Sequence, residues 1–229
     1  SVLSLQVMKF LVTGSSGFIG FHLIKKLLDS GHEVVGIDNH NDYYNPDLKF
    51  KRLALLDSKK NFSFHLSDIN NISLEDRNFD LAINLAAQAG VRVSKDKEHL
   101  YEYSNIAGFK SFCNFCREKD INKILYASSS SVYSDADKGK FCENETSLNP
   151  KSEYGKSKHM NEIYASELIK SCDLSMVGLR FFSVYGPFGR PDMAYYSFTK
   201  ASKENRTISL NNEGNMYRDM TFIDDIIKG

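Results

Sequence analysis

The amino-acid sequence predicts a doubly wound α/β fold, in which helices cover both faces of a parallel sheet. Short β-branched or apolar runs alternate along the chain with longer segments of helical period. The expected strands are apolar on both faces, as strands are when helices cover them on each side. A glycine-rich turn, Gly14–Gly20, connects the first strand to the first helix.

The pattern locates each element of this sheet in chain order. Strands are predicted at Lys9–Val12, Glu33–Ile37, Phe62–Leu66, Leu81–Leu85, Lys123–Ser128 and Ser175–Phe181. Helices are predicted at Phe18–Asp29, Pro46–Leu56, Leu74–Arg77, Lys97–Lys119 and Tyr154–Ser171. Gly31 closes the first helix and Pro46 suits the first turn of the second. The polar, turn-rich segment Asp135–Pro150 is expected to be a surface loop.

The pattern changes from about Pro187. A helix at Met193–Glu204, strands at Thr207–Leu210 and Met220–Ile223, and a turn between these strands are expected. We therefore predict a dinucleotide-binding domain over residues 1–186 and a partial substrate-binding lobe over 187–229. Asp224-Asp225 should cap a further helix that starts without being buried, so the chain is expected to be a fragment that lacks its C-terminal portion.

Composition restricts the class of protein. The 229 residues carry 29 Lys+Arg and 29 Asp+Glu, so the formal net charge is zero and gives no field that would attract nucleic acid. No apolar run approaches the roughly 20 residues that span a bilayer, and Ser1–Val7 lacks the basic start of a signal peptide. Four cysteines are too few for a disulfide scaffold and suit a reducing compartment. A cytoplasmic protein is predicted.

The glycine-rich turn has the chemistry of a pyrophosphate site. Glycines at Gly14, Gly17 and Gly20, with Phe18 and Ile19 between them, allow the backbone to approach a phosphate closely at the N-terminus of a helix. Asp38 ends the second strand, where a carboxylate accepts hydrogen bonds from a ribose diol and repels a 2′-phosphate. The pair predicts NAD rather than NADP in a Rossmann fold, against the simpler interpretations of a strand–helix turn and a turn aspartate.

A second group of residues predicts proton transfer. Tyr154 and Lys158 lie one turn apart on a predicted helix and so share a face. An ammonium beside a phenol lowers the pKa of the phenol and makes it a general base, and Ser129 ends a neighbouring strand. The competing interpretation, a surface tyrosine with a lysine one turn later, weakens because the glycine turn and Asp38 belong to the same chain.

From Lys9 to Gly229 the sequence resembles the extended short-chain dehydrogenases/reductases, and more closely the UDP-glucuronate 4-epimerases. The resemblance is carried by Val12–Gly20, Gly36–Tyr44, Asn84–Arg92, Tyr126–Tyr133, Tyr154–Lys158, Leu179–Pro187, Arg190–Met193 and Arg218–Asp225. Gly36–Tyr44 and Arg190–Met193 point to the epimerases. Asn84 departs from the histidine that the family usually has there, and Ser134 and Ser183 replace its usual glycine and threonine.

The resemblance implies roles for individual residues. It places the catalytic set on Ser129, Tyr154 and Lys158, and implies a homodimer with a four-helix interface. Cofactor contacts are expected from Gly14, Gly17, Phe18, Ile19, Gly20, Asp38, Asn39, Asp68, Ile69, Leu85, Ala86, Ala87, Gln88, Asn105, Ser128, Tyr154, Lys158 and Phe181. Substrate contacts are expected from Arg92, Ser130, Ser131, Ser183, Arg190 and Arg218, and no metal is expected.

The predicted reaction inverts C4 of a UDP-sugar through a 4-keto intermediate with bound NAD, and UDP-glucuronate is the expected substrate. Oxidation at C4 of a glucuronate gives a β-keto acid, which loses CO2 unless its carboxylate is restrained. A guanidinium suits that task, so Arg190 is the expected clamp and Arg92 the reserve.

Three alternatives stay open. The first is an epimerase of neutral UDP-hexoses, and the second a dehydratase or decarboxylase of the same superfamily. The second is disfavoured because Ser130 and Ser131 occupy the place of the acid that those enzymes carry. The third is an NAD-binding sensor without catalysis. Cys113 and Cys116 have the spacing of metal ligands, but no second pair accompanies them, so core packing is expected.

Overall fold

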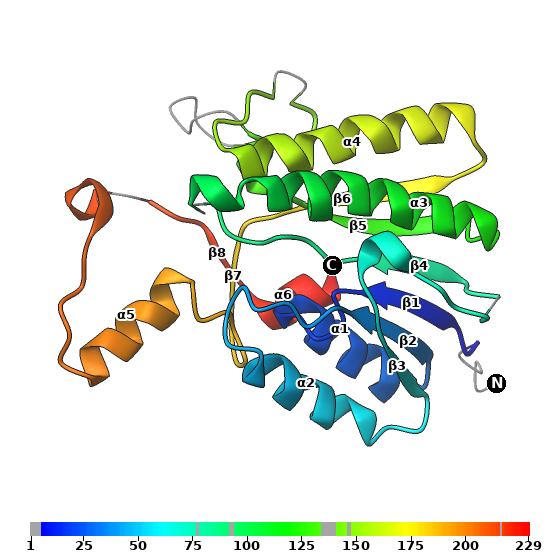
Figure 1. Ribbon diagram of the computed structural model, residues 1–229, viewed down its shortest axis with the longest axis horizontal. Coiled ribbons are helices and arrows are strands. Elements are labelled where there is room, and N and C mark those ends of the chain that lie inside the picture. The colour runs from blue at the N-terminus through cyan, green and yellow to red at the C-terminus, as the bar shows by residue number, and fades with distance from the viewer. Residues whose placement is uncertain (1–5, 77, 92–93, 134–140, 146–147, 216) are drawn as a thin grey trace.

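A six-stranded parallel sheet forms the centre of the molecule, which is described by a computed structural model (Figure 1). The structure describes residues 6–76, 78–91, 94–133, 141–145, 148–215 and 217–229. The strands are β1 (Lys9–Thr13), β2 (Glu33–Asp38), β3 (Phe62–Leu66), β4 (Leu81–Asn84), β5 (Lys123–Ser129) and β6 (Ser175–Phe181). Their order is β3-β2-β1-β4-β5-β6, so the order reverses between β1 and β4, and the predicted doubly wound sheet is confirmed.

Helices cover both faces of this sheet. The helices α1 (Phe18–Asp29) and α2 (Asp47–Asp57) lie on one face, while α3 (Gly108–Glu118) and α4 (Glu153–Ser171) lie on the other (Figure 1). Successive residues of β1 divide between the two layers: Phe10 and Val12 pack toward α1, and Leu11 packs toward α3. This division is the two-faced burial that the apolar strands predict.

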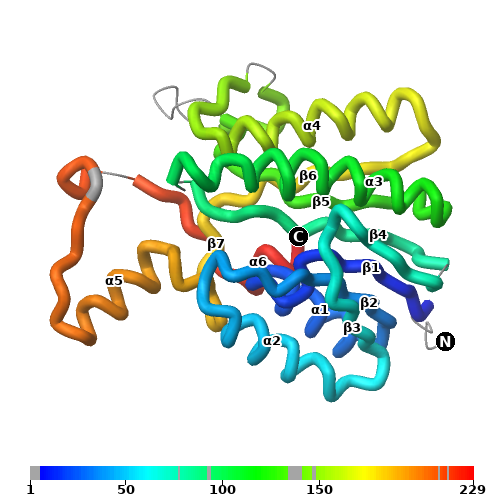
Figure 2. The backbone as a smooth tube through the Cα atoms, in the orientation of Figure 1, coloured from blue at the N-terminus to red at the C-terminus, as the bar shows by residue number. Residues whose placement is uncertain are grey.

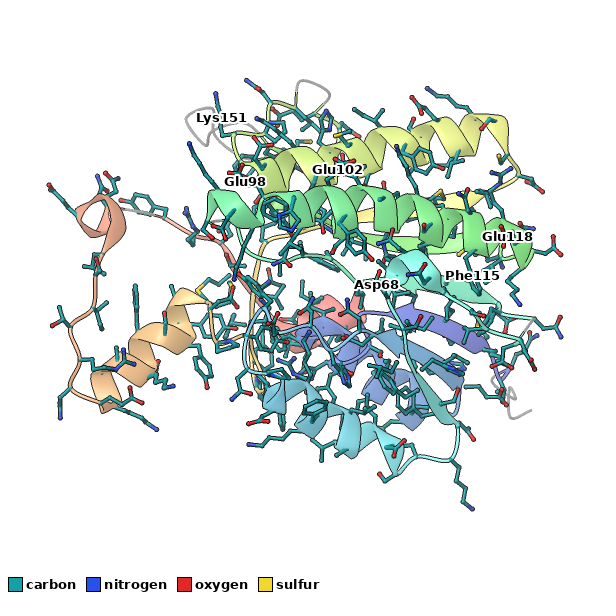
Figure 3. All side chains as sticks on the ribbon, viewed as in Figure 1. Asp68, Glu98, Glu102, Phe115, Glu118 and Lys151 are labelled. Carbon is teal, nitrogen blue, oxygen red and sulfur yellow. The ribbon has the colours of Figure 1, made fainter. Side chains whose placement is uncertain are left out.

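The segment predicted as one long helix over 97–119 consists of three parts. A 3-10 turn at Lys95–Lys97 comes first, and a π-helical segment, Tyr101–Ala107, leads into α3. Figure 3 shows Glu98, Glu102 and Glu118 along this run. A π-helical turn often marks a functional position, and this one contains the buried Asn105 and Tyr101.

Two predicted elements are wrong. Leu74–Asp76 is not helical, because so short a segment cannot nucleate a helix and Leu74 instead accepts a hydrogen bond from the Lys119 ammonium at its carbonyl. Arg77 lies outside the described residues. Thr207–Leu210 forms no strand: no described strand pairs with it, and Ile208 and Leu210 are exposed. Strand propensity alone does not form a strand without a partner.

The C-terminal part holds a second, two-stranded parallel sheet. The unpredicted strand β7 (Ser183–Tyr185) pairs with β8 (Met220–Phe222). The helix α6 (Ile223–Lys228) then packs on α1, with Ile223 fully buried beside Phe18 and Val184. The prediction that this helix is not buried is therefore wrong, as is the aspartate cap: α6 begins after Phe222, and Asp224 and Asp225 lie in its first turn.

Between the two small strands the chain leaves the layered body. The helix α5 (Ala194–Lys203) and the residues that follow it project to one side (Figures 1 and 2). Most of their side chains are exposed, and Tyr217 is 91% exposed. The predicted boundary between residues 186 and 187 stays a prediction. None of the described helices is long and apolar enough to cross a membrane.

Candidate active site

The turn between β1 and α1 has no room for side chains at its glycines. Gly14 has a φ of +71°, and a Cβ on it would lie 2.7 Å from the amide nitrogen of Ala86. A Cβ on Gly20 would lie 2.2 Å from the carbonyl oxygen of Gly14. Glycine is therefore required at both positions, since the backbone of the turn folds directly onto the helix and onto the loop after β4.

The same turn fits a dinucleotide pyrophosphate. The first residue before α1, Gly17, is extended and provides no side-chain cap, so the amides of the first helical turn have no side-chain acceptor there. The hydroxyl of Ser15 is buried without a hydrogen-bond partner among the described residues. An uncapped helix N-terminus is an anion site, and an orphaned buried hydroxyl beside it provides a further donor.

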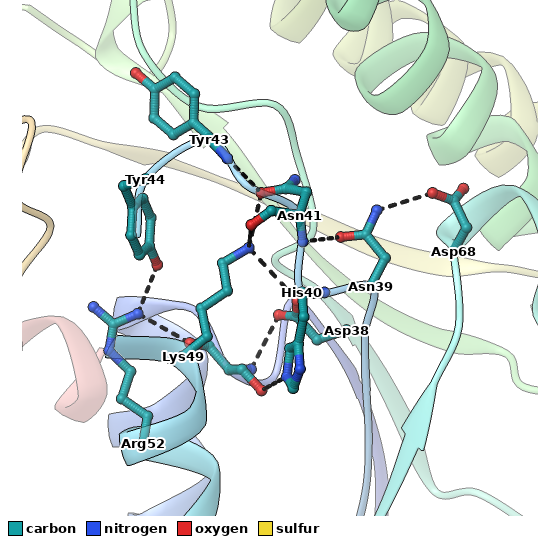
Figure 4. Close-up of polar contacts among 10 residues, drawn as sticks. Asp38, Asn39, His40, Asn41, Tyr43, Tyr44, Lys49, Arg52 and Asp68 are labelled. Atoms are coloured by element: carbon teal, nitrogen blue, oxygen red, sulfur yellow. Dashed lines mark hydrogen bonds and ion pairs between the residues drawn. The ribbon is translucent and has the colours of Figure 1, made fainter. Parts of the chain in front are cut away.

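Asp38 ends β2 beside this turn, with only 8% of its surface exposed. Its carboxylate accepts hydrogen bonds from the backbone amides of Ser16 (3.1 Å) and His40 (2.9 Å). The ammonium of Lys49, itself buried, lies 3.8 Å from Asp38 Oδ1 and donates to Asn41 (Figure 4). These contacts hold the carboxylate fixed at the carboxyl end of its strand, where the sequence predicts a ribose contact.

Three further residues that are predicted to contact the cofactor, Asn39, Asp68 and Ile69, lie at or near the ends of β2 and β3. The Asn39 amide donates to Asp68 Oδ2 at 2.9 Å, which joins the ends of β2 and β3 (Figure 4). Burial raises the pKa of Asp68, but hydrogen bonds from Asn70 and Asn39 outweigh it and lower the pKa overall. Ile69 is buried in the core, and Figure 3 shows Asp68 at the turn that follows β3.

The loop after β4 is held by the buried Asn105. Its amide oxygen accepts from the backbone of Gln88 at 2.8 Å, and its amide nitrogen donates to the Gln88 carbonyl and to Ser157. Thr13 binds the Asn84 side chain at 2.6 Å and accepts from the Ala86 amide. Of the predicted cofactor contacts, Leu85 and Ala86 thus lie beside Gly14, and Asn105 holds Gln88 in place.

Tyr154, Ser129 and Lys158 lie together as the sequence predicts. Ser152 caps α4 by accepting from the Gly155 amide, which sets Tyr154 in the first turn of the helix. The Tyr154 phenol forms a side-chain hydrogen bond with Ser129 at the end of β5. Lys158 is 2% exposed, lies 5.9 Å from the centroid of the Tyr154 ring and donates to the Ala127 carbonyl at 2.9 Å.

The electrostatics of this set differ from the prediction. Burial raises the pKa of the Tyr154 phenol, while the Arg190 guanidinium and the hydrogen bond with Ser129 act to lower it. Burial also lowers the pKa of Lys158 to about 8. The pKa of Tyr154 is thus raised rather than lowered, and the role predicted for Lys158 in lowering it stays a prediction, since its ammonium donates to a backbone carbonyl.

Arg190 lies on the loop that follows β7. Its Nε donates to Asp192 Oδ1 at 3.0 Å and its Nη2 to Asp192 Oδ2 at 2.5 Å. Its guanidinium carbon lies 6.0 Å from the ring centroid of Tyr43, whose hydroxyl also donates to Asp192. Burial disfavours the charged form, but the hydrogen bonds with Asp192 outweigh it and raise the pKa of Arg190.

The other predicted substrate residues are dispersed. Ser130 and Ser131 form a short 3-10 turn after β5, in which the Ser131 amide donates to the Ser129 hydroxyl. Ser183 lies in β7, with its amide donating to the Asp219 carbonyl. Arg218 is exposed and contacts the Tyr217 carbonyl, and Arg92 lies outside the described residues.

Sequence reasoning missed a polar group behind the catalytic set. Glu162, one turn after Lys158 on α4, accepts from the Ser128 hydroxyl at 2.5 Å. It also binds Arg180 through two hydrogen bonds of 2.9 Å, and Arg180 lies over the Tyr133 ring. Ser128, predicted to contact the cofactor, therefore directs its hydroxyl to α4. The helical spacing of Tyr154, Lys158 and Glu162 could have indicated this third member.

Two further predictions concern the core. Cys113 and Cys116 are fully buried and pack in the core below α3, and burial raises the pKa of both thiols, that of Cys113 to about 12. The core-packing interpretation is confirmed. Phe181, a predicted cofactor contact, packs against the buried cluster of Phe18, Val184 and Ile223. The assignments of individual site residues to ligands stay predictions.

Comparisons with known proteins agree with this arrangement. The model of the NAD dependent epimerase/dehydratase family matches residues 10–229. Protein CapI of Staphylococcus aureus is 43% identical over 226 residues, which cover 96% of this chain and 67% of that protein. UDP-glucuronate 4-epimerase 4 of Arabidopsis thaliana is 44% identical over 230 residues, 96% of this chain and 52% of that protein.

Solved structures show the same fold. UDP-glucuronic acid 4-epimerase from Bacillus cereus, in complex with UDP-glucuronic acid and NAD, matches with a TM-score of 0.90 and 35% identity over 96% of this chain and 71% of that one. MoeE5 in complex with UDP-glucose and NAD matches with a TM-score of 0.83 and 31% identity. The chain thus spans about two thirds of CapI and about half of the Arabidopsis protein.

These matches confirm the fold, the enzyme class and the cofactor that the sequence predicts. The family is described by its dependence on NAD, and the glycine turn, the orphaned Ser15 hydroxyl and the fixed Asp38 carboxylate fit that cofactor. The chain belongs to the NAD dependent epimerase/dehydratase family.

Proposed function

We propose that this chain carries the cofactor site and catalytic centre of a UDP-sugar 4-epimerase that converts UDP-glucuronate to UDP-galacturonate. The observation that carries the proposal is the position of Arg190, whose fixed positive charge acts on the half-buried side chain of Tyr154. A relative and a solved structure whose names specify UDP-glucuronate as substrate support it.

In this proposal each residue of the set has one task. Tyr154, as phenolate, removes the proton of the sugar 4-hydroxyl, and Ser129 holds the same oxygen through its hydroxyl. Bound NAD+ supplies the acceptor and later the donor of the C4 hydride. Lys158, buried with a pKa of about 8, holds a movable proton beside the phenol near neutral pH. The 4-keto sugar turns within the site, and Tyr154 returns the proton to the inverted oxygen.

Arg190 is suited to restrain the sugar carboxylate. Asp192 and the Tyr43 ring orient its guanidinium through Nε and Nη2, whereas Nη1 donates no hydrogen bond within the described part of the chain. A guanidinium held in this way can bind a carboxylate in fixed geometry without reorganising. Fixing the carboxylate keeps its bond to C5 away from the alignment that would release CO2 while C4 is a ketone.

A neutral UDP-hexose is the second candidate substrate. The full pairing of Arg190 with Asp192 favours it, because the pair needs no anion to balance its charge. MoeE5 in complex with UDP-glucose is a similar structure. A dehydratase or decarboxylase is disfavoured, since Ser130 and Ser131 are not acids. A sensor without catalysis leaves the hydrogen bond between Ser129 and Tyr154 without a purpose.

Two further properties are part of the proposal. A homodimer would cover the apolar side chains that α4 and the π-helical segment expose, among them Met160, Ile163, Ile169 and Tyr103. Tyr101, Ile106, Phe109, Phe112, Phe115 and Leu168 are buried within the chain itself and would not take part in such an interface. A cytoplasmic location suits the free cysteines.

The experiment that tests the substrate is the replacement Arg190→Ala in the natural protein that carries this chain. We expect KM for UDP-glucuronate to rise about tenfold or more through loss of a charge-assisted contact, with a decarboxylated UDP-pentose among the products. Arg206→Ala is the matched control, because Arg206 is an exposed arginine paired with the nearby Glu204. Normal turnover of UDP-glucuronate by Arg190→Ala would instead favour the neutral hexose.

A further inference from the structure

Arg52, on α2, contacts three separate parts of the site although it lies outside them. Its side chain is completely buried. Nη1 donates to the Ser16 carbonyl (2.9 Å) and to the Tyr44 hydroxyl (2.7 Å), and Nη2 donates to the Phe188 carbonyl (2.6 Å) (Figure 4 shows the first two). These hydrogen bonds, called here the Arg52 bridge, join the glycine-rich turn, the loop after Asp38 and the loop before Arg190.

The acceptors of the Arg52 bridge are all uncharged. None of the ion pairs found among the described residues includes Arg52, whereas its neighbour Lys49, one turn away, lies beside Asp38. A buried cation without an anion is destabilising, so a chain selected for stability alone would use an apolar residue at this position. The arrangement therefore indicates that Arg52 serves to position the groups that its guanidinium binds.

Phe188, whose carbonyl Arg52 binds, has a strained backbone conformation. Phe188 has a φ of +59°, a left-handed conformation that bulky residues rarely adopt. Its ring packs against Phe21, and its carbonyl is the acceptor of Arg52 Nη2. Strain of this kind persists where surrounding contacts enforce it, and such positions cluster at functional sites. Gly189 and Arg190 follow Phe188 directly in the sequence. The backbone conformation of Phe188 therefore determines where the backbone of Arg190 lies.

We propose that Arg52 is a positioning residue that ties the sugar-side loop, residues 186–190, to the cofactor-binding turn. The inference rests on the proposed function and extends it, because it identifies the residue that holds the loop carrying Arg190 in place. Ser16 belongs to the turn that fits the pyrophosphate, and its amide binds Asp38 while its carbonyl binds Arg52. A cofactor that fixes this turn therefore also fixes Arg52, and through Arg52 the loop that presents Arg190.

The test measures backbone amide hydrogen exchange of residues 186–193 by mass spectrometry, with and without NAD. In the unaltered protein we expect NAD to slow exchange there as well as at Gly14–Gly20. In Arg52→Met, which retains the length of the side chain but lacks its donors, exchange of 186–193 should be about tenfold faster and insensitive to NAD, while NAD still slows exchange at Gly14–Gly20. Lys51→Met, an exposed neighbour on α2, is the control and should match the unaltered protein.

Arg52→Lys covers the case in which the methionine variant fails to fold. A lysine keeps the charge, but its single ammonium lacks the two separate nitrogens through which Arg52 reaches the Ser16 and Phe188 carbonyls, so exchange of 186–193 should still rise. KM for UDP-glucuronate should rise with it, more than kcat falls. Exchange at 186–193 equal to that of the unaltered protein in Arg52→Met, or fully restored in Arg52→Lys, overturns the inference. The exchange measurement requires no sugar, so a failure of the epimerase proposal alone would leave its outcome unchanged.

Discussion

The cofactor side and the sugar side of this site are built in opposite ways. On the cofactor side, main-chain groups and short buried side chains form the surface: Gly14 and Gly20 admit no Cβ, and Asp38 is held by two backbone amides. On the proposed sugar side, the residues predicted to contact the substrate include long side chains on loops, such as the half-buried Arg190 and the exposed Arg218. The comparison shows that the first side is fixed by the fold, whereas the second depends on contacts between loops.

The largest expected effect comes from adding a methyl group to a glycine of the cofactor side. Gly20→Ala should lower the free energy of unfolding by more than about 3 kcal/mol and abolish NAD binding, because its Cβ meets the Gly14 carbonyl at 2.2 Å. Gly31→Ala is the control. Gly31, unlike Gly20, has a positive φ, but its Cβ would meet nothing within 4 Å, so only backbone strain of about 1 kcal/mol is expected. Urea unfolding and calorimetric NAD titration measure both, and equal losses in the two variants would contradict the account.

Lys158→Met should stabilise the protein at neutral pH by at most about 3 kcal/mol, because the lysine pKa falls from 10.5 in the unfolded chain to about 8 in the folded one. Between these two pKa values the unfolded chain binds more protons, so the stability of the unaltered protein rises with pH there. The advantage of Lys158→Met should accordingly shrink above pH 8 and vanish above pH 10.5. A constant difference across that range, with exposed Lys156→Met as control, would refute the buried ammonium.

Asp38→Ala tests the fixed carboxylate of the cofactor side. Loss of a charged acceptor should weaken NAD binding about tenfold and weaken NADP binding less, since the repulsion of a 2′-phosphate also disappears. Asp57→Asn, at the end of α2, is the control and should leave both affinities unchanged. Calorimetry with the two dinucleotides measures the ratio, and an unchanged preference for NAD would exclude Asp38 as its source.

The smallest effect is expected on the sugar side. Arg218→Ala should change the free energy of unfolding by less than about 0.5 kcal/mol, because the side chain is exposed and contacts only the neighbouring Tyr217 carbonyl. Weaker binding of UDP with unchanged stability would support the predicted contact of Arg218 with the substrate. A large loss of stability would show that the sugar side is as firmly built as the cofactor side.

The same division explains how far the sequence could predict the structure. All six strands of the main sheet lie where apolar period predicts them, to within one residue, because the inner strands are buried and the edge strands β3 and β6 still pair with a buried neighbour. The strand β7 was not expected, since its three residues pair only with the distant β8. The elements predicted at Leu74–Asp76 and Thr207–Leu210 do not form, because local propensity acts there without a neighbouring element against which they could pack.

The site followed the same rule. The glycine turn, Asp38 and the pair of Tyr154 and Lys158 were predictable, because each lies on one element at a fixed spacing. The bonds of Arg52 to Ser16 and Phe188, and of Glu162 to Ser128 and Arg180, join residues distant in sequence. Contacts of this kind cannot be predicted from the spacing of residues along the chain. The effect of Arg190 on Tyr154 was missed for that reason: Lys158 is near in sequence, whereas Arg190 is near only in the fold.

The central claim is that Tyr154 and bound NAD invert C4 of UDP-glucuronate through a ketone, and a labelled substrate tests it directly. UDP-glucuronate deuterated at C4 is incubated with the natural protein that carries this chain, and the products are followed by NMR. The account predicts UDP-galacturonate that retains deuterium at C4, because the same hydride is withdrawn and returned, and no turnover in Tyr154→Phe although NAD stays bound. Loss of the deuterium to water, undiminished turnover in Tyr154→Phe, or inversion of UDP-glucose but not of UDP-glucuronate would contradict it.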